Sequence, residues 1–175
     1  MKKKLNTSKI IKAVLSAVII AAIVVVSYKY LIPRTISTHG NYVTDLKDDK
    51  NLVGISHNVF IGQVTSKKGT KDLGSGPETQ FNVKVLQDIK GELKGAIVVN
   101  QQCGRKGNIF YTVDNDTLLE EGKTYLFATR NDAIEGWQTA ITVYGHLEIK
   151  SANDKEKMIS RFEKAFKEQT MFDYD

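Results

Sequence analysis

Cysteine is nearly absent from this sequence, since Cys103 is the only one among 175 residues. A single cysteine excludes an internal disulfide, and it also excludes the paired Cys-x-x-Cys spacing of structural zinc sites. The three histidines, His39, His57 and His146, lie far apart, and no H-E-x-x-H or H-x-x-E-H sequence occurs. We therefore expect no metal and no cofactor, and a fold that is stabilised by its apolar core.

Acidic residues are missing from the first 34 positions. Seven of the 25 Lys and Arg residues lie there, and none of the 20 Asp and Glu residues does. The rest of the chain carries 18 basic against 20 acidic side chains, so the formal net charge of +5 belongs to the leader. Aromatic residues suited to stacking single-stranded bases are also few, namely Phe81, Phe110 and Tyr111. We predict no binding to nucleic acid.

Charge is also absent from the 16 residues between Lys12 and Lys29. As a helix this stretch rises about 24 Å, slightly less than the roughly 30 Å hydrocarbon core of a bilayer. Apolar neighbours extend the stretch to residues 10–32, which makes this segment a candidate for membrane contact. Five lysines precede it, so the positive-inside rule places the N-terminus in the cytoplasm and everything after residue 34 outside.

A cleaved signal peptide is the alternative, because it too has a basic start followed by an apolar run. Val25 and Ser27 fit the −3 and −1 positions of a cleavage site, although no A-x-A sequence ends the run. An uncleaved segment predicts a single-pass protein of the cell membrane, whereas cleavage predicts a secreted protein. Both alternatives place the remaining chain outside the cytoplasm.

Composition divides the chain after the leader (residues 1–34) into three parts. Residues 35–51 are polar and contain a glycine, which predicts a tether. Residues 52–170 hold the apolar pattern of one extracytoplasmic domain, within the size that a single core commonly supports. Residues 171–175 form a short tail.

Apolar and polar residues alternate in several short runs of the domain. The clearest run is residues 79–89, where Phe81, Val83 and Val85 share one face. In residues 59–65, Gly62 predicts a bulge or bend. Further strands are expected at residues 96–101, 109–113, 125–129, 137–144 and 145–150. Glycine and charged residues predict long exposed loops at residues 67–78 and 102–108.

The last part of the domain has the pattern of a helix that begins after Ser151. Ser151 precedes Asp154 by three residues, which resembles a capping box. The apolar residues recur at helical spacing and should pack against the strands: Met158, Ile159, Phe162, Ala165 and Phe166. The chain is thus predicted to be mainly β, a small OB-like barrel of five to seven strands with a C-terminal helix, behind one N-terminal transmembrane or signal helix. An up-and-down sandwich is the alternative.

Three segments of the domain resemble a known type of protein. They are VFIGQVTS, TQFNVKVLQDIKGELKGAIVVNQ and LLEEGKTYLFATR, and they are similar to small exported bacterial OB-fold proteins of the netrin and TIMP-like kind. The matching positions are Gly62, Thr79, Val83, Val85, Lys90, Gly91, Leu118, Gly122, Tyr125 and Phe127. The resemblance implies a fold over residues 50–150. It does not imply metalloprotease inhibition, because the inhibitors use an N-terminal cysteine and Cys103 lies elsewhere.

Basic residues gather in the two predicted loops. Because OB barrels commonly bind ligands along one sheet face and between such loops, these residues are the candidate ligand contacts: Lys67, Lys68, Lys71, Arg105 and Lys106. The alternative is a solvated charge run. The paired acids Asp114 and Asp116 and the pair Glu120 and Glu121 lie in predicted turns, where we expect them to be solvated.

We predict that the chain is not an enzyme and has no catalytic residues. The first hypothesis is a membrane-tethered, extracytoplasmic binding module of unknown ligand, with an envelope protein or a cell-wall polymer as its partner. The second is a secreted inhibitor or effector of an extracellular hydrolase. The third is an enzyme in which Cys103, paired with His57 or His146, is a nucleophile. Nothing around Cys103 resembles a known nucleophile sequence.

Overall fold

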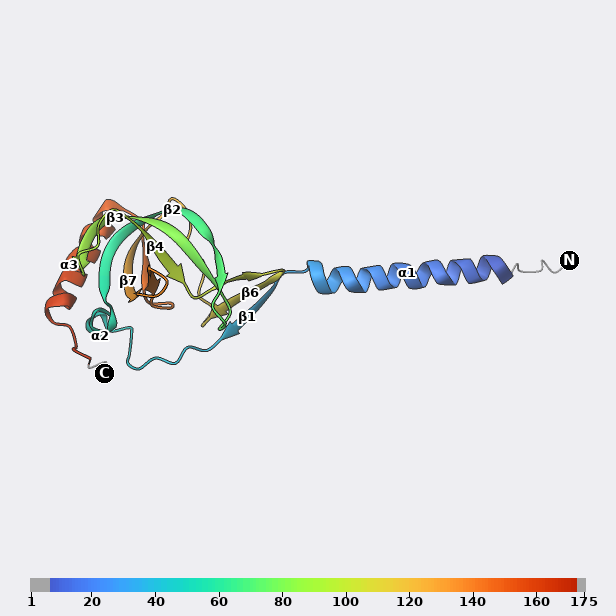
Figure 1. The fold of residues 1–175 in the computed structure, drawn as a ribbon, viewed down its shortest axis with the longest axis horizontal. Helices are drawn as coiled ribbons and strands as arrows, with labels where there is room; N and C mark the ends of the chain where they lie inside the picture. Colours follow the sequence, from blue (N-terminus) through green and yellow to red (C-terminus); the bar gives the residue numbers. More distant parts are fainter. Residues whose placement is uncertain (1–6, 173–175) are drawn as a thin grey trace.

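The computed structural model describes residues 7–172, so Lys2, Lys3, Lys4 and residues 173–175 of the predicted tail lie outside the described residues. Within this range the chain forms a long N-terminal helix, two small sheets and two further helices (Figure 1). The elements are α1 (Thr7–Leu31), β1 (Arg34–Thr38), α2 (Asp49–Ile55), β2 (Asn58–Asp72), β3 (Pro77–Lys90), β4 (Ala96–Gln101), β5 (Gly104–Lys106), β6 (Ile109–Val113), β7 (Thr124–Asp132), β8 (Trp137–Ala140), β9 (His146–Ile149) and α3 (Ala152–Lys167).

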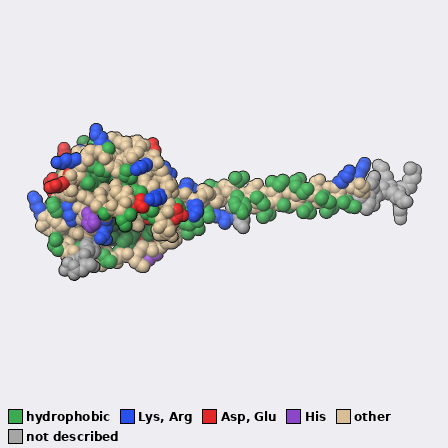
Figure 2. Space-filling model, in the orientation of Figure 1, with side chains coloured by type: hydrophobic (Ala, Val, Ile, Leu, Met, Phe, Trp, Pro, Cys, Tyr) green, Lys and Arg blue, Asp and Glu red, His purple; other side chains and the backbone are tan. Residues whose placement is uncertain are grey.

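Helix α1 confirms the predicted N-terminal apolar helix. Residues Ser8–Tyr28 form a span of 21 residues with a mean hydropathy of 2.7, and none of it is buried. At about 1.5 Å per residue such a span rises roughly 31 Å, close to the thickness of a bilayer core. Figure 2 shows apolar side chains along the visible length of this helix. The helix therefore has the length and surface of a signal sequence or a membrane anchor.

The larger sheet has six strands in the order β2-β3-β4-β8-β7-β9. Strand β2 also pairs with β7, so hydrogen bonds run in a ring through β2, β3, β4, β8 and β7. The register shifts between Ile61 and Gly62, which confirms the predicted irregularity. A Cβ atom at Gly62 would lie 2.6 Å from Cγ1 of Val83, so glycine permits the close approach of β2 and β3.

Alternation along the strands produces two apolar clusters. Every strand of the ring contributes to the first cluster, which therefore fills its interior: Phe60, Val64, Phe81, Val83, Val99, Tyr125, Phe127 and Ala140, joined by Leu119. The second cluster lies on the outer face, where the alternate residues of β2 and β7 pack against α2 and α3. Phe162 and Ala165 of α3 are buried there. The C-terminal helix was correctly predicted from its apolar face, although Phe166 of that face is exposed.

The smaller sheet has three strands in the order β1-β6-β5, and β1 runs parallel to β6. The N–H of Arg34 donates to the carbonyl of Asn108 at 2.9 Å, and Asn108 Nδ2 donates to the carbonyl of Ile32 at 2.8 Å. Strand β1, which includes residues 35–38 at the start of the predicted tether, therefore lies directly after α1. The sequence conceals this strand because all five side chains are exposed.

Two other predictions about the fold need correction. The chain is a mixed α/β protein with about 40% strand rather than mainly β, because α1 and α3 contribute long helices. The predicted loop at residues 67–78 is mostly a hairpin, in which Lys71 pairs with Glu78 and Asp72 with Pro77. The second predicted loop contains β5. Both segments are polar, so they lack the alternation of apolar residues by which a strand is recognised in a sequence, although their backbones pair.

Candidate ligand-binding pocket

The five basic residues predicted as ligand contacts lie on strands rather than in loops. Lys67, Lys68 and Lys71 are on β2, and Arg105 and Lys106 are on β5. The structure joins the two groups through Asp72, whose carboxylate accepts from Lys106 Nζ at 2.9 Å. This contact places β5 beside the far end of the β2–β3 hairpin.

Three of these cations already have partners within the chain. The ammonium of Lys71 pairs with the carboxylate of Glu135 and lies 5.4 Å from the ring centroid of Trp137. The guanidinium of Arg105 lies 5.2 Å from the ring centroid of Phe110. Lys106 is neutralised by Asp72, as described above. The charges are thus spread over two strands, and their part in ligand binding remains a prediction.

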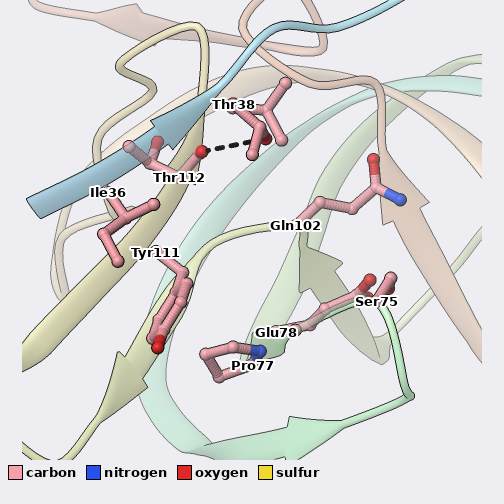
Figure 3. A pocket seen from close by; sticks show the side chains of 10 residues that line it. Ile36, Thr38, Ser75, Pro77, Glu78, Gln102, Tyr111 and Thr112 are labelled. Carbon is pink, nitrogen blue, oxygen red and sulfur yellow. Dashed lines mark hydrogen bonds between the residues drawn. The ribbon is translucent and has the colours of Figure 1, made fainter.

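A cavity of about 220 Å³ lies between the two sheets. Its walls come from β1, β6 and the β2–β3 turn, three segments that are far apart in the sequence. Figure 3 shows Ile36 and Tyr111 on one side, with Ser75, Pro77 and Glu78 on the other. The same strand β1 that joins the domain to α1 therefore also forms one wall of this pocket.

Glu78 is the charged residue of the pocket. Only 7% of its surface is exposed, and its Oε2 accepts a hydrogen bond from Asn100 Nδ2 at 2.5 Å. Asn100 is held in turn by Gln80, whose Nε2 donates to Asn100 Oδ1 at 2.6 Å. Within residues 7–172 no Lys, Arg or His forms an ion pair with Glu78. Glu78, a residue that is 93% buried, thus lines the pocket with one amide as the side-chain partner of its carboxylate.

Gln102 lines the pocket, and Cys103 and Gly104 follow it in the chain. Thr79 Oγ1 donates to the carbonyl of Cys103 at 2.7 Å, and a Cβ atom at Gly104 would lie 2.7 Å from the carbonyl oxygen of Pro77. Glycine at position 104 thus lets β5 approach the start of β3. The thiol of Cys103 is buried, and burial, with smaller effects from the charges of Asp116 and Glu78, raises its pKa to about 12. Little thiolate exists at neutral pH, which weighs against a role for Cys103 as nucleophile.

A hydrogen-bonded segment lies beyond the end of β6. Asp114 Oδ2 accepts from Tyr42 Oη at 2.8 Å and from the N–H of Gly40 at 3.2 Å, and Oδ1 lies 2.6 Å from His39 Nδ1. These bonds fix residues 39–42, the middle of the predicted tether, against the end of β6. The hydrogen bond from Tyr42 is the largest effect on the pKa of Asp114, which lies below its ordinary value.

Asp116 is buried, unlike the solvated acid that its position in a predicted turn indicates. Its Oδ1 lies 3.0 Å from Nε2 of His146, and its Oδ2 accepts from Gln101 Nε2 at 3.2 Å and from the N–H of Val143 at 3.3 Å. Burial alone would raise the pKa of Asp116, but hydrogen bonds from His146 and Gln101 outweigh it and lower this pKa. Asp116 therefore organises a buried polar cluster behind the pocket.

The other histidine that the sequence offered as a partner for Cys103 is also held. His57 Nδ1 accepts from the N–H of Asn131 at 3.0 Å, and burial lowers its pKa. In the part of the chain that the structure describes, no group of three His, Cys, Asp or Glu residues is placed to hold a metal ion.

Sequence reasoning missed the pocket residues. Thr38, Glu78 and Tyr111 come together because β1 pairs with β6 and the hairpin turn folds over them. No spacing in the sequence links positions so far apart. A partial signal exists for Glu78, which is the last residue of the predicted loop and directly precedes the clearest predicted strand.

Comparison with protein-family models and with curated proteins finds no match for this chain. The similarity to netrin and TIMP-like domains therefore remains a prediction from the residues themselves.

Proposed function

We propose that this protein is a single-pass, membrane-anchored binding module whose C-terminal domain lies outside the cytoplasm and binds an envelope protein or a cell-wall polymer. One observation carries the proposal. A fully exposed apolar span of 21 residues leads, within three residues of the end of α1, into a strand that forms a wall of the pocket. Anchor and pocket thus belong to one continuous structure, so a bound partner would be held close to the bilayer.

The finer fold that supports this proposal is an OB-like barrel. A ring of five paired strands around one apolar cluster, with a helix packed on the outside, agrees with that architecture. OB domains bind ligands with irregular segments at the rim of the barrel. The pocket lies in such a place, between the β2–β3 turn and the added three-stranded sheet.

The orientation rests on charge at the two ends of α1. Five lysines precede the uncharged stretch that begins after Lys12, so the N-terminus stays in the cytoplasm and the domain is translocated. Residues 32–33 separate α1 from β1, and hydrogen bonds of Asn108 and Arg34 join the two elements. The domain is therefore held near the membrane surface by a short junction, which differs from a long flexible tether.

The proposal is tested directly by determining on which side of the membrane each end of the chain lies. The full-length chain, carrying one epitope at each end, is expressed in bacterial cells whose wall has then been removed, and protease is added outside. We expect loss of the C-terminal epitope, retention of the N-terminal epitope in the membrane fraction, and a chain mass that includes residues 1–34. Protection of the C-terminal epitope would overturn the orientation. A mature N-terminus at Tyr28, with the domain in the medium, would instead support the secreted inhibitor or effector.

A further inference from the structure

We propose that the pocket between β1, β6 and the β2–β3 turn binds a primary ammonium group carried on a flexible chain, as in a lysine side chain of a partner polypeptide, with Glu78 as its counter-ion. This inference rests on the proposed binding function and names the chemistry of the ligand. Four observations support the inference: the unused hydrogen-bond acceptor capacity of Glu78, the negative charges near the pocket, the volume of the cavity, and the side chains that line the cavity.

The carboxylate of Glu78 has more acceptor capacity than the structure uses. An ionised carboxylate offers about four lone-pair positions, and Asn100 occupies one of them on Oε2. The Glu78 residue is 93% buried, and a buried carboxylate is best stabilised by a cation. Lys71 is the residue directly opposite Glu78 on β2, yet its ammonium pairs with Glu135. Within residues 7–172 no cation of the chain pairs with Glu78, which leaves Oε1 for a cation from outside.

Negative charge predominates next to the pocket, at Cys103. The charges of Glu78 and Asp116 both raise the pKa of Cys103, the residue that follows Gln102 of the pocket lining. The charge of Lys67 lowers the pKa of Cys103, but by less than the charge of Asp116 or of Glu78 raises it. A cation entering the pocket is therefore attracted, whereas an anion is repelled.

The cavity suits a side chain rather than a larger molecule. Its volume of about 220 Å³ lies below the range of about 300–1,000 Å³ typical of pockets for drug-sized ligands and cofactors. Ile36, Pro77 and Val113 supply apolar surface for the methylene groups of a lysine-like chain. The ring of Tyr111 faces the same space and can stabilise a cation by its π electrons.

The hydrogen bond from Asn100 favours an ammonium over a guanidinium. Arginine gains most from a carboxylate when two N–H groups reach both oxygens in parallel. In this pocket Asn100 occupies Oε2, so a bidentate pair would have to compete with an internal bond. An ammonium is a compact charge that needs one oxygen and is satisfied by further acceptors, such as the hydroxyl groups of Thr38 and Ser75 at the rim.

The test uses the full-length chain in nanodiscs of neutral lipid, with the methyl and aromatic NMR signals of the pocket as readout. The probes are Nα-acetyl-lysine methylamide, its isosteric neutral analogue from norleucine, and the arginine analogue. We expect saturable shifts at Tyr111 and Ile36, and an affinity for the lysine probe at least tenfold above that for the norleucine probe.

Two substitutions separate the counter-ion from general effects of charge. Glu78→Gln keeps an oxygen that can accept from Asn100 and should lower the affinity for the lysine probe at least tenfold. Glu156→Gln removes a carboxylate from the exposed surface of α3 and should leave the affinity unchanged. Tyr111→Leu should lower it severalfold while the chain stays folded.

Three outcomes would overturn the inference: equal binding of the lysine and norleucine probes, tighter binding of the arginine probe, or an unchanged affinity in Glu78→Gln. None of these outcomes tests whether α1 is a membrane anchor, because insertion into the nanodisc and the protease experiment test the anchor separately. If the lysine probe binds as expected, a lysine-containing peptide and a wall peptide with a free amino group identify the source of the ammonium by their relative affinities.

Discussion

Helix α1 and the ring of strands use the same apolar residue types in opposite ways. In α1 the large apolar side chains are 42–74% exposed, from Ile10 at one end to Leu31 at the other. In the ring, Phe60, Phe81 and Phe127 are at most 2% exposed. The ring thus forms its core from its own strands, whereas no other part of residues 7–172 covers α1. An exposed apolar surface of this extent requires either a lipid environment or cleavage of the helix from the domain.

Polar groups show the same contrast. No charged residue lies in the 16 residues of α1 between Lys12 and Lys29, where, in the proposed anchor, a charge would meet lipid. The domain buries Glu78, Asn100, Gln101 and Asp116, and each has hydrogen-bond partners inside the chain. The two regions should therefore respond independently, the helix to changes in insertion and the domain to changes in packing.

The largest effect is expected from Phe127→Ala. Phe127 is fully buried and stacks on Phe60 with ring centroids 5.2 Å apart, so its loss leaves a cavity inside the ring. We expect the free energy of unfolding of the domain to fall by about 3–5 kcal/mol, measured by denaturant titration in nanodiscs. Membrane association should not change. The matched control is Ile134→Ala, at a residue that is 96% exposed, and an equal loss there would contradict the assignment of the core.

A charge in α1 should have the opposite consequences. An aspartate at the centre of a membrane-spanning helix costs about 2.5–3.5 kcal/mol of insertion free energy, so Ile19→Asp should reduce the membrane-bound fraction strongly. The unfolding midpoint of the domain should stay the same, because Ile19 contacts no part of it in the described structure. Ile134→Asp places the same charge on the surface of the domain and should leave insertion unchanged. A fall in domain stability in Ile19→Asp would show that the two regions are coupled.

The features that local rules govern could be predicted from the sequence. Ser151 accepts from the N–H of Asp154 at 3.1 Å, as the capping pattern indicates, and α3 begins at the next residue. Gly62 lies at a register shift, as a glycine inside a strand pattern indicates. In both cases the residues that determine the structure are neighbours in the chain or alternate along a single strand.

The features that depend on distant pairing could not be predicted. Strand β1 is polar, exposed and only five residues long, and it exists because β6 lies beside it. The pocket depends on this pairing and on the β2–β3 hairpin, whose glycine-rich sequence resembles a loop. The burial of Asp116 has the same origin, because its partners Gln101 and His146 come from β4 and β9.

Asp116→Asn tests how much the buried polar cluster contributes to the domain. The carboxylate accepts from Gln101 and from the N–H groups of Thr117 and Val143, and it holds Val143 in a left-handed conformation (φ 67°) that a β-branched residue rarely adopts. Asparagine would turn an NH₂ group toward these donors, so we expect the free energy of unfolding to fall by about 1–3 kcal/mol. The surface substitution Glu156→Gln is the matched control and should change it little.

The pH dependence of the loss in unfolding free energy distinguishes the effect of the charge of Asp116 from the effect of its hydrogen-bond geometry. The pKa of Asp116 in the folded protein lies below the ordinary value of 3.8, so its ionised form stabilises the fold. That contribution is complete above pH 3.8 and is lost as the pH falls through the lowered pKa. The difference in unfolding free energy between the natural chain and Asp116→Asn should therefore shrink in acid, as followed by denaturant titration at several pH values. A difference that stays constant down to the lowest pH at which the domain is folded would mean that Asp116 acts through its geometry alone.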